Sequence, residues 1–177
     1  LTIIDELGAD PLRFTMAILS GTRDIKLSRQ RIEGYRNFGT KLWNATRFCQ
    51  MNGCARAEGF DPAQVKAPLN RWIVGETQRT AATVTAALAD CGFDETANGL
   101  YRFIWNQFCD WYVELAKPLL TGDDAAAKAE TQATAAWALD VILKLLHPVM
   151  PYITEELWGQ TADLGAPRSE PMLMTAR

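Results

Sequence analysis

The sequence contains no long apolar run, although 48% of its 177 residues are hydrophobic. A membrane-spanning helix needs about 20 consecutive apolar residues, and the basic-then-apolar pattern of a secretory leader is missing as well. We therefore expect a cytoplasmic globular protein that does not bind membranes. The amount of apolar material suits one domain with a sizeable core.

Histidine and cysteine, the usual ligands of zinc, are scarce. The sole histidine is His147, and none of the four cysteines belongs to a C-x-x-C pair. Zinc sites need several closely spaced ligands of these types, so we expect no metal site. His147 precedes Pro148 at the end of an apolar helix, and we interpret it as a helix-terminal residue rather than a catalytic one. A disulfide between two cysteines remains open, whereas free thiols are the usual state in a cytosolic protein.

Strand patterns are absent too, because no stretch alternates β-branched and polar residues, and helical periodicity covers most of the chain. Helices are predicted over residues 10–20, 28–52, 68–90, 94–118, 125–146 and 151–158. Asp10, as a capping acceptor before Pro11, is predicted to start the first helix, and Gly53 to end the second. The predicted fold is an all-α antiparallel bundle of about five to six helices.

The net charge of −3 argues against a generally basic nucleic-acid-binding protein, but the charge is unevenly distributed. Residues 23–57 hold eight cations and two carboxylates, a net charge of +6, which leaves −9 for the rest of the chain. Such a local excess indicates a surface that faces a polyanion. A solvated helix face would give the same excess, so both interpretations stand at this point.

The helix predicted over residues 28–52 lies in this cationic segment and is amphipathic. On a helical wheel its apolar residues share one arc. The opposite side carries polar and charged residues, among them Arg29, Gln30, Arg36, Asn37, Lys41, Asn44 and Arg47. Phe48 breaks this separation, because it lies about 20° from Lys41 on the polar side.

An aromatic ring among cations has two interpretations. Phe48 could pack beneath a neighbouring loop, or it could face solvent and stack on an unpaired base, which contributes about 1–3 kcal/mol. Around such a ring, cations hold phosphates, and amides or guanidinium groups read base edges. Donors of these kinds surround Phe48 on the wheel, namely Asn37, Lys41, Asn44 and Arg47. Arg29 and Arg36 share the stripe of Arg47, which suits them to contacts with the nucleic-acid backbone.

A second aromatic cluster lies between residues 101 and 112, and we predict that it belongs to the core. Residues at α-helical spacing within and after it are Ile104, Phe108, Trp111 and Leu115. Asp110 and Glu114 of the same helix are predicted to position cations of the 28–52 helix through hydrogen bonds.

Several sequence runs resemble known proteins. The runs over residues 21–25 (GTRDI), 31–38 (RIEGYRNF), 41–48 (KLWNATRF) and 100–115 closely resemble the valyl-tRNA synthetases. The runs over residues 7–14 and 147–158 resemble motifs shared more widely by the aliphatic class I synthetases. The similarity extends from residue 1 to about residue 160. Isoleucyl and leucyl relatives usually lack the Gly-Tyr-Arg-Asn-Phe helix.

This resemblance implies a helical bundle that binds the anticodon stem-loop of tRNA(Val) and reads its middle adenine and final cytosine. It implies RNA contacts at Lys41, Arg47 and Phe48. The family has a basic residue where this chain has Gln30. Arg29 and Arg31 flank that position, so a neighbour could retain the contact.

The resemblance also implies a larger enzyme. That enzyme would be monomeric and would attach valine to tRNA with ATP and Mg²⁺, using catalytic, editing and C-terminal arm domains outside this chain. The chain, which begins at Leu1 within a helical pattern, would be an excised piece without a cofactor. Residues 1–27 would form a connector with the first helix, residues 28–164 the anticodon-binding bundle, and residues 165–177 an irregular tail.

Two alternatives remain. The chain could belong to an isoleucyl- or leucyl-type synthetase. It could also be a helical protein-interaction module in which Phe48 anchors a partner helix.

Overall fold

The structure is a computed structural model that describes residues 2–21, 27–168 and 170–176. Its helices in these ranges are α1 (Thr2–Leu7), α2 (Ala9–Leu19), α3 (Arg29–Met51), α4 (Pro68–Ala89), α5 (Phe93–Tyr101), the π-helical η2 (Arg102–Tyr112), α6 (Val113–Thr121), α7 (Ala125–Leu146) and α8 (Pro151–Gln160), with 3₁₀ turns η1 (Pro62–Gln64) and η3 (Leu173–Thr175). The all-α prediction is confirmed. In the same ranges no helix is long and apolar enough to cross a membrane.

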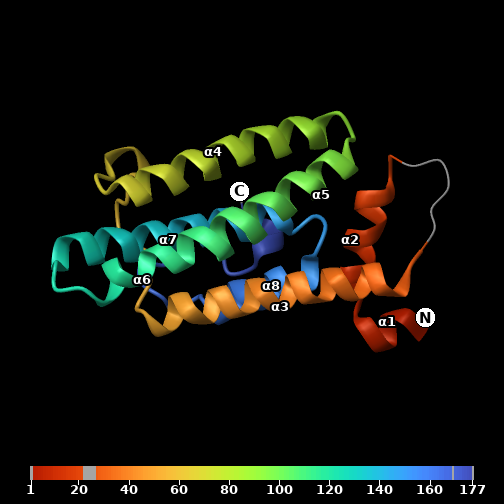
Figure 1. The fold of residues 1–177 in the computed structure, drawn as a ribbon, viewed down its shortest axis with the longest axis horizontal. Coiled ribbons are helices and arrows are strands. Elements are labelled where there is room, and N and C mark those ends of the chain that lie inside the picture. The colour runs from red at the N-terminus through yellow and green to blue at the C-terminus, as the bar shows by residue number, and fades with distance from the viewer. Residues whose placement is uncertain (1, 22–26, 169, 177) are drawn as a thin grey trace.

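The long helices form two layers. In Figure 1, α4, the continuous α5–η2–α6 rod and α3 lie next to one another in a front layer, with α7 and α8 behind it. Helix α2 stands across one end of the bundle and packs against α3 and α5. Buried aromatic and aliphatic side chains fill the space between these helices, among them Phe14, Phe38, Leu42, Phe108 and Leu139.

The rod departs from α-helical geometry over Arg102–Tyr112. Hydrogen bonds here join residues five apart; the N–H of Val113, for example, donates to the carbonyl of Phe108. Each turn therefore contains more residues, and the buried positions are Phe103, Ile104, Phe108, Cys109, Tyr112 and Val113. The prediction that Trp111 and Leu115 face the core was wrong, because they are 61% and 51% exposed.

Asp10 and Arg13 of α2 hold the start of α8. The buried Asp10 carboxylate accepts hydrogen bonds from two N–H groups in the first turn of α8, at 3.2 Å and 2.7 Å. The guanidinium of Arg13 donates to the carbonyls of Pro148 and Val149 at 2.9 Å and 3.1 Å. Burial raises the pKa of Asp10 despite the two N–H donors. Asp10 therefore caps α8 rather than its own helix, which begins at Ala9 and not at Pro11 as predicted.

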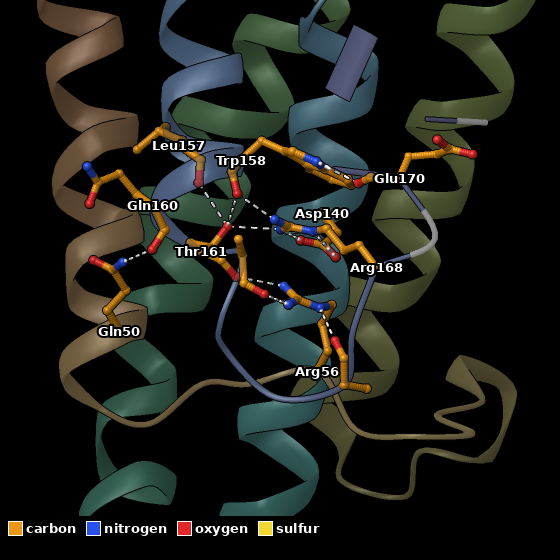
Figure 2. A network of polar contacts seen from close by, with 11 residues as sticks. Gln50, Arg56, Asp140, Leu157, Trp158, Gln160, Thr161, Arg168 and Glu170 are labelled. Atoms are coloured by element: carbon orange, nitrogen blue, oxygen red, sulfur yellow. Dashed lines mark hydrogen bonds and ion pairs between the residues drawn. The ribbon is translucent and has the colours of Figure 1, made fainter. Parts of the chain in front are cut away.

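Two arginines fasten the segment that follows α8 (Figure 2). Arg56, in the loop after α3, donates to three backbone carbonyls between residues 161 and 166, at 2.5 to 2.9 Å. Arg168 lies 3.5 Å from the ring centre of Trp158 and forms an ion pair with Asp140 of α7. Arg56 is thus one of the cations in residues 23–57 that the fold itself uses.

The four cysteines are free, as expected: Cys49, Cys54 and Cys109 are buried, and Cys91 is exposed. Of the cations in residues 23–57, Arg23 and Lys26 lie outside the described residues.

Glu130 of α7 caps the start of α4. Its carboxylate accepts hydrogen bonds from the side-chain amide of Asn70 and from the N–H groups of Lys66 and Ala67, each at 2.9 Å. Burial by itself would raise the pKa of Glu130, but the three hydrogen bonds together lower it. The hydrogen bonds of the folded chain therefore stabilise the ionised form of the Glu130 carboxylate.

Replacing this carboxylate tests the cap. Because the folded-state pKa of Glu130 is lowered, its contribution to stability is present above the unfolded-state pKa and is lost as the pH falls through the folded value. We expect Glu130→Gln to lower the free energy of unfolding by about 1–2 kcal/mol at neutral pH, and by less near about pH 4. Urea unfolding at both pH values measures this, with Glu58→Gln in an exposed loop as the control. An equal loss at both pH values would contradict the role of the charge.

Candidate RNA-binding surface

Lys41 is held in place by the neighbouring rod. Its ammonium group forms an ion pair with the Asp110 carboxylate and lies 4.2 Å from the ring centre of Trp105. The prediction that Asp110 positions a cation of this helix is therefore confirmed. The two side chains are 28% and 44% exposed, and an ammonium group has three donors while a carboxylate accepts at several positions. After pairing, both groups still have hydrogen-bonding positions that face the surface.

Phe48 lies on the same edge of α3, two turns further along. Its ring is half-buried against the core, and the Lys117 ammonium group of α6 is 5.9 Å from the ring centre. The ring is therefore neither fully exposed to solvent nor sealed inside the bundle, so it combines features of both interpretations. At 1.5 Å per residue, Phe48 lies about 10 Å along α3 from Lys41, so the ring and the Lys41–Asp110 pair are two separate points on one edge of the helix.

The outward side of α3 carries the uncompensated charge. Its exposed residues include Arg36, Asn37, Asn44 and Arg47. Neither Arg36 nor Arg47 forms an ion pair within the part of the chain that the structure describes. Arg36 also borders an apolar groove of about 580 Å³ between α2, α3 and α8, so it lies toward the opposite edge from Lys41.

The start of α3 is a separate region. It carries three predicted residues, all exposed: Arg29, Gln30 and Arg31. Arg29 forms an ion pair with Glu6 of α1 at 2.5 Å, so part of its charge is offset. At 1.5 Å per residue, Gln30 and Phe48 are about 27 Å apart along the helix. These residues therefore cannot contact the same nucleotide as Phe48.

The rod contributes residues that the sequence pattern of α3 did not reveal. Trp105 and Lys117 contact Lys41 and Phe48, and Asp110 completes the pair. The prediction that Glu114 positions a cation of α3 was wrong, because Glu114 pairs with Lys117 of its own helix at 2.6 Å. A signal was present in the sequence: residues 110, 114 and 117 form one polar stripe at helical spacing.

Comparison with known proteins identifies relatives of this chain. The valine--tRNA ligase of Caulobacter vibrioides is 70% identical over 178 residues, covering 100% of this chain and 20% of that protein. The valine--tRNA ligase of Bradyrhizobium diazoefficiens is 60% identical over 163 residues, covering 92% of this chain and 17% of that protein. The resemblance to the valyl-tRNA synthetases is confirmed, and the chain spans about a fifth of the length of these relatives.

A solved structure with a similar fold is the Agrobacterium radiobacter LeuRS in a ternary complex with tRNA and LeuAMS. The TM-score is 0.69 and the match covers 99% of this chain and 20% of that one, at 17% identity. At this identity the likeness concerns the fold alone.

A family model described as the anticodon-binding domain of tRNA ligase matches residues 70–175. This match begins within α4, whereas the similarity to the Caulobacter protein also includes α3 with Lys41 and Phe48. More than half of the chain fits the model, and the rest continues into the same bundle. The chain belongs to the family of anticodon-binding domains of tRNA ligases.

Proposed function

We propose that this chain binds the anticodon stem-loop of tRNA(Val) within a valine–tRNA ligase. That enzyme attaches valine to tRNA with ATP and Mg²⁺ in the cytoplasm, acts as a monomer, and holds ATP and Mg²⁺ outside this chain. The 70% identity over the whole chain supports valine rather than isoleucine or leucine as the amino acid. The observation that carries the RNA-binding proposal is the fixed Lys41–Asp110 pair, with the half-buried Phe48 ring two turns further along the same edge of α3.

The pair provides a donor and an acceptor side by side. Adenine and cytosine each present an acceptor ring nitrogen beside an amino donor on the Watson–Crick edge, whereas guanine and uracil present an N–H group beside a carbonyl. The ammonium group of Lys41 suits the ring nitrogen, and the carboxylate of Asp110 suits the amino group. Such a pair therefore favours adenine and cytosine, which are the bases that valyl-tRNA synthetases are expected to read.

Phe48 and the exposed cations complete the surface. Because Phe48 lies about 10 Å along α3 from Lys41, its ring stacks on a different base of the loop from the one whose edge meets the Lys41–Asp110 pair. Arg47 and Arg36 hold backbone phosphates, because no carboxylate in the described part of the chain pairs with either guanidinium. Asn37 and Asn44 lie on the same exposed side and donate to base or ribose groups.

The start of α3 contacts a more distant part of the RNA. At about 27 Å from Phe48, Arg29, Gln30 and Arg31 are placed to contact the stem rather than the loop. Gln30 contributes hydrogen bonds without a charge, and Arg31 supplies the cation. In the proposed domain arrangement, residues 1–27 connect to the catalytic part, residues 28–164 form the RNA-binding bundle, and residues 165–177 are a tail.

Removing the Phe48 ring tests the stacking. We expect Phe48→Ala to weaken binding of a valine anticodon stem-loop by about 1–3 kcal/mol, because an unpaired base loses its platform. Fluorescence titration gives the affinity, and thermal melting in parallel shows that the half-buried position still folds. Phe93→Ala is the matched control, since Phe93 is 46% exposed at the start of α5. An unchanged affinity in a folded Phe48→Ala chain would rule out stacking.

Neutralising an exposed cation tests the phosphate contacts. We expect Arg47→Gln to weaken binding and to lower the slope of log affinity against log salt by about 0.7, the change for one phosphate contact on a single strand. Titrations at several salt concentrations measure the slope. The control is Lys128→Gln in the first turn of α7, which should leave the slope unchanged. A protein-interaction module would show no such salt dependence with RNA.

Changing the acceptor tests how bases are read. We expect Asp110→Asn to reduce the preference for adenine over guanine at the middle anticodon position, because an amide can donate to the guanine carbonyl as well as accept. Competition between stem-loops that differ at this one base measures the preference, and Glu114→Gln is the control on the same stripe. A preference that survives in Asp110→Asn shows that another group reads the base.

A further inference from the structure

On the other side of the rod from Phe48, we propose a second site for an unpaired base. It is a cleft lined by Leu69 and Trp72 of α4, Trp111 of η2 and Leu115 of α6. The base stacks there on an indole ring, and the site binds it without distinguishing one base from another. This inference rests on the proposed function, because it concerns a second nucleotide of the same RNA.

The lining of the cleft determines what it accepts. Its volume is about 420 Å³, and all four side chains are apolar except for the indole N–H groups. Trp111 is 61% and Leu115 51% exposed, while Leu69 and Trp72 are half-buried. A surface with aromatic faces and few polar groups binds any base by stacking, because each base has a π-face and no edge is read.

The exposure of these side chains follows from the π-helical geometry of the rod. At α-helical spacing from Ile104 and Phe108, Trp111 and Leu115 would turn toward the core. The wider turn of η2 buries Tyr112 instead and leaves the indole of Trp111 in solvent. An indole outside the core forgoes the free energy of burial, and π-helical segments are rare and frequently occur at functional sites.

The cleft lies on the α4 side of the α5–η2–α6 rod, and Phe48 lies on its α3 side. Helices α3, the rod and α4 form a single layer (Figure 1), so one RNA loop can lie across all three. Asp110 contacts α3, whereas the next residue, Trp111, lines the cleft with α4. The separation is about one helix spacing, roughly 10 Å, which a short stretch of single strand spans.

We take the occupant to be a base rather than a protein segment, because the cleft lies next to the surface proposed to bind the RNA loop. The cleft adjoins the Lys41–Asp110 pair, because Asp110 of that pair and Trp111 of the cleft are consecutive residues. A loop that gives one base to Phe48 brings the neighbouring nucleotides to the rod. The rival occupant is an apolar protein segment from elsewhere in the ligase, and it would leave RNA affinity independent of Trp111.

The test uses this chain with the valine anticodon stem-loop. We expect Trp111→Ala to weaken binding about 5- to 150-fold, and Trp111→Phe to restore most of the affinity because a phenyl ring also stacks. The loss should be the same whichever base occupies the contacted loop position. An abasic nucleotide there should weaken binding to the original chain but not to Trp111→Ala. Tyr152→Ala, which removes a 68% exposed ring on α8, is the control and should bind normally.

The outcomes separate this inference from the function on which it rests. If Phe48→Ala weakens binding and Trp111→Ala does not, the anticodon-binding proposal stands and the second site is wrong. If the original chain does not bind the valine anticodon stem-loop, both proposals fail. A Trp111→Ala loss that depends on which base is present would overturn the claim of binding without identification.

Discussion

The packing of α3 against the α5–η2–α6 rod is the constraint on which the rest of the surface depends. Phe38 and Leu42 of α3 and Phe108 of the rod are fully buried, and burial of such side chains contributes about 1.5–3 kcal/mol each. A partly exposed ion pair such as Lys41–Asp110 contributes only about 0–1 kcal/mol. The core therefore fixes the spacing of the two helices, and the polar pair uses that spacing to present a donor and an acceptor at a defined place.

The helical spacing of apolar residues and the residues that end helices predicted most of the fold. All six helices expected from apolar spacing are present, and α3 ends one residue before Asn52 because Gly53 adopts a left-handed conformation at its end. The amphipathic wheel also placed Lys41 and Phe48 on one edge, and both contact the rod. These features are local, so the sequence within each helix contains the information that determines them.

Features that depend on a second helix were not predictable in this way. The wheel of α3 cannot show that Lys117 of α6 lies over the Phe48 ring. It also cannot show that Arg56, in the loop after α3, donates hydrogen bonds to carbonyls more than 100 positions later. The exposure of Trp111 was missed because the expectation assumed one helical pitch throughout, whereas η2 follows a wider one. In each case the missing information concerns how separate elements meet or how the backbone departs from standard geometry.

Arg56 and Arg168, which hold the segment after α8, determine where the smallest stable unit of this bundle ends. Shortening the chain to the last turn of α8 would remove Arg168 and leave the Asp140 carboxylate of α7 without its partner. Arg56 would also lose the carbonyl of residue 166. The bundle consequently includes the eight residues 161–168 beyond α8, even though they have little regular secondary structure, and a fragment that stops at α8 would have a destabilised rear layer.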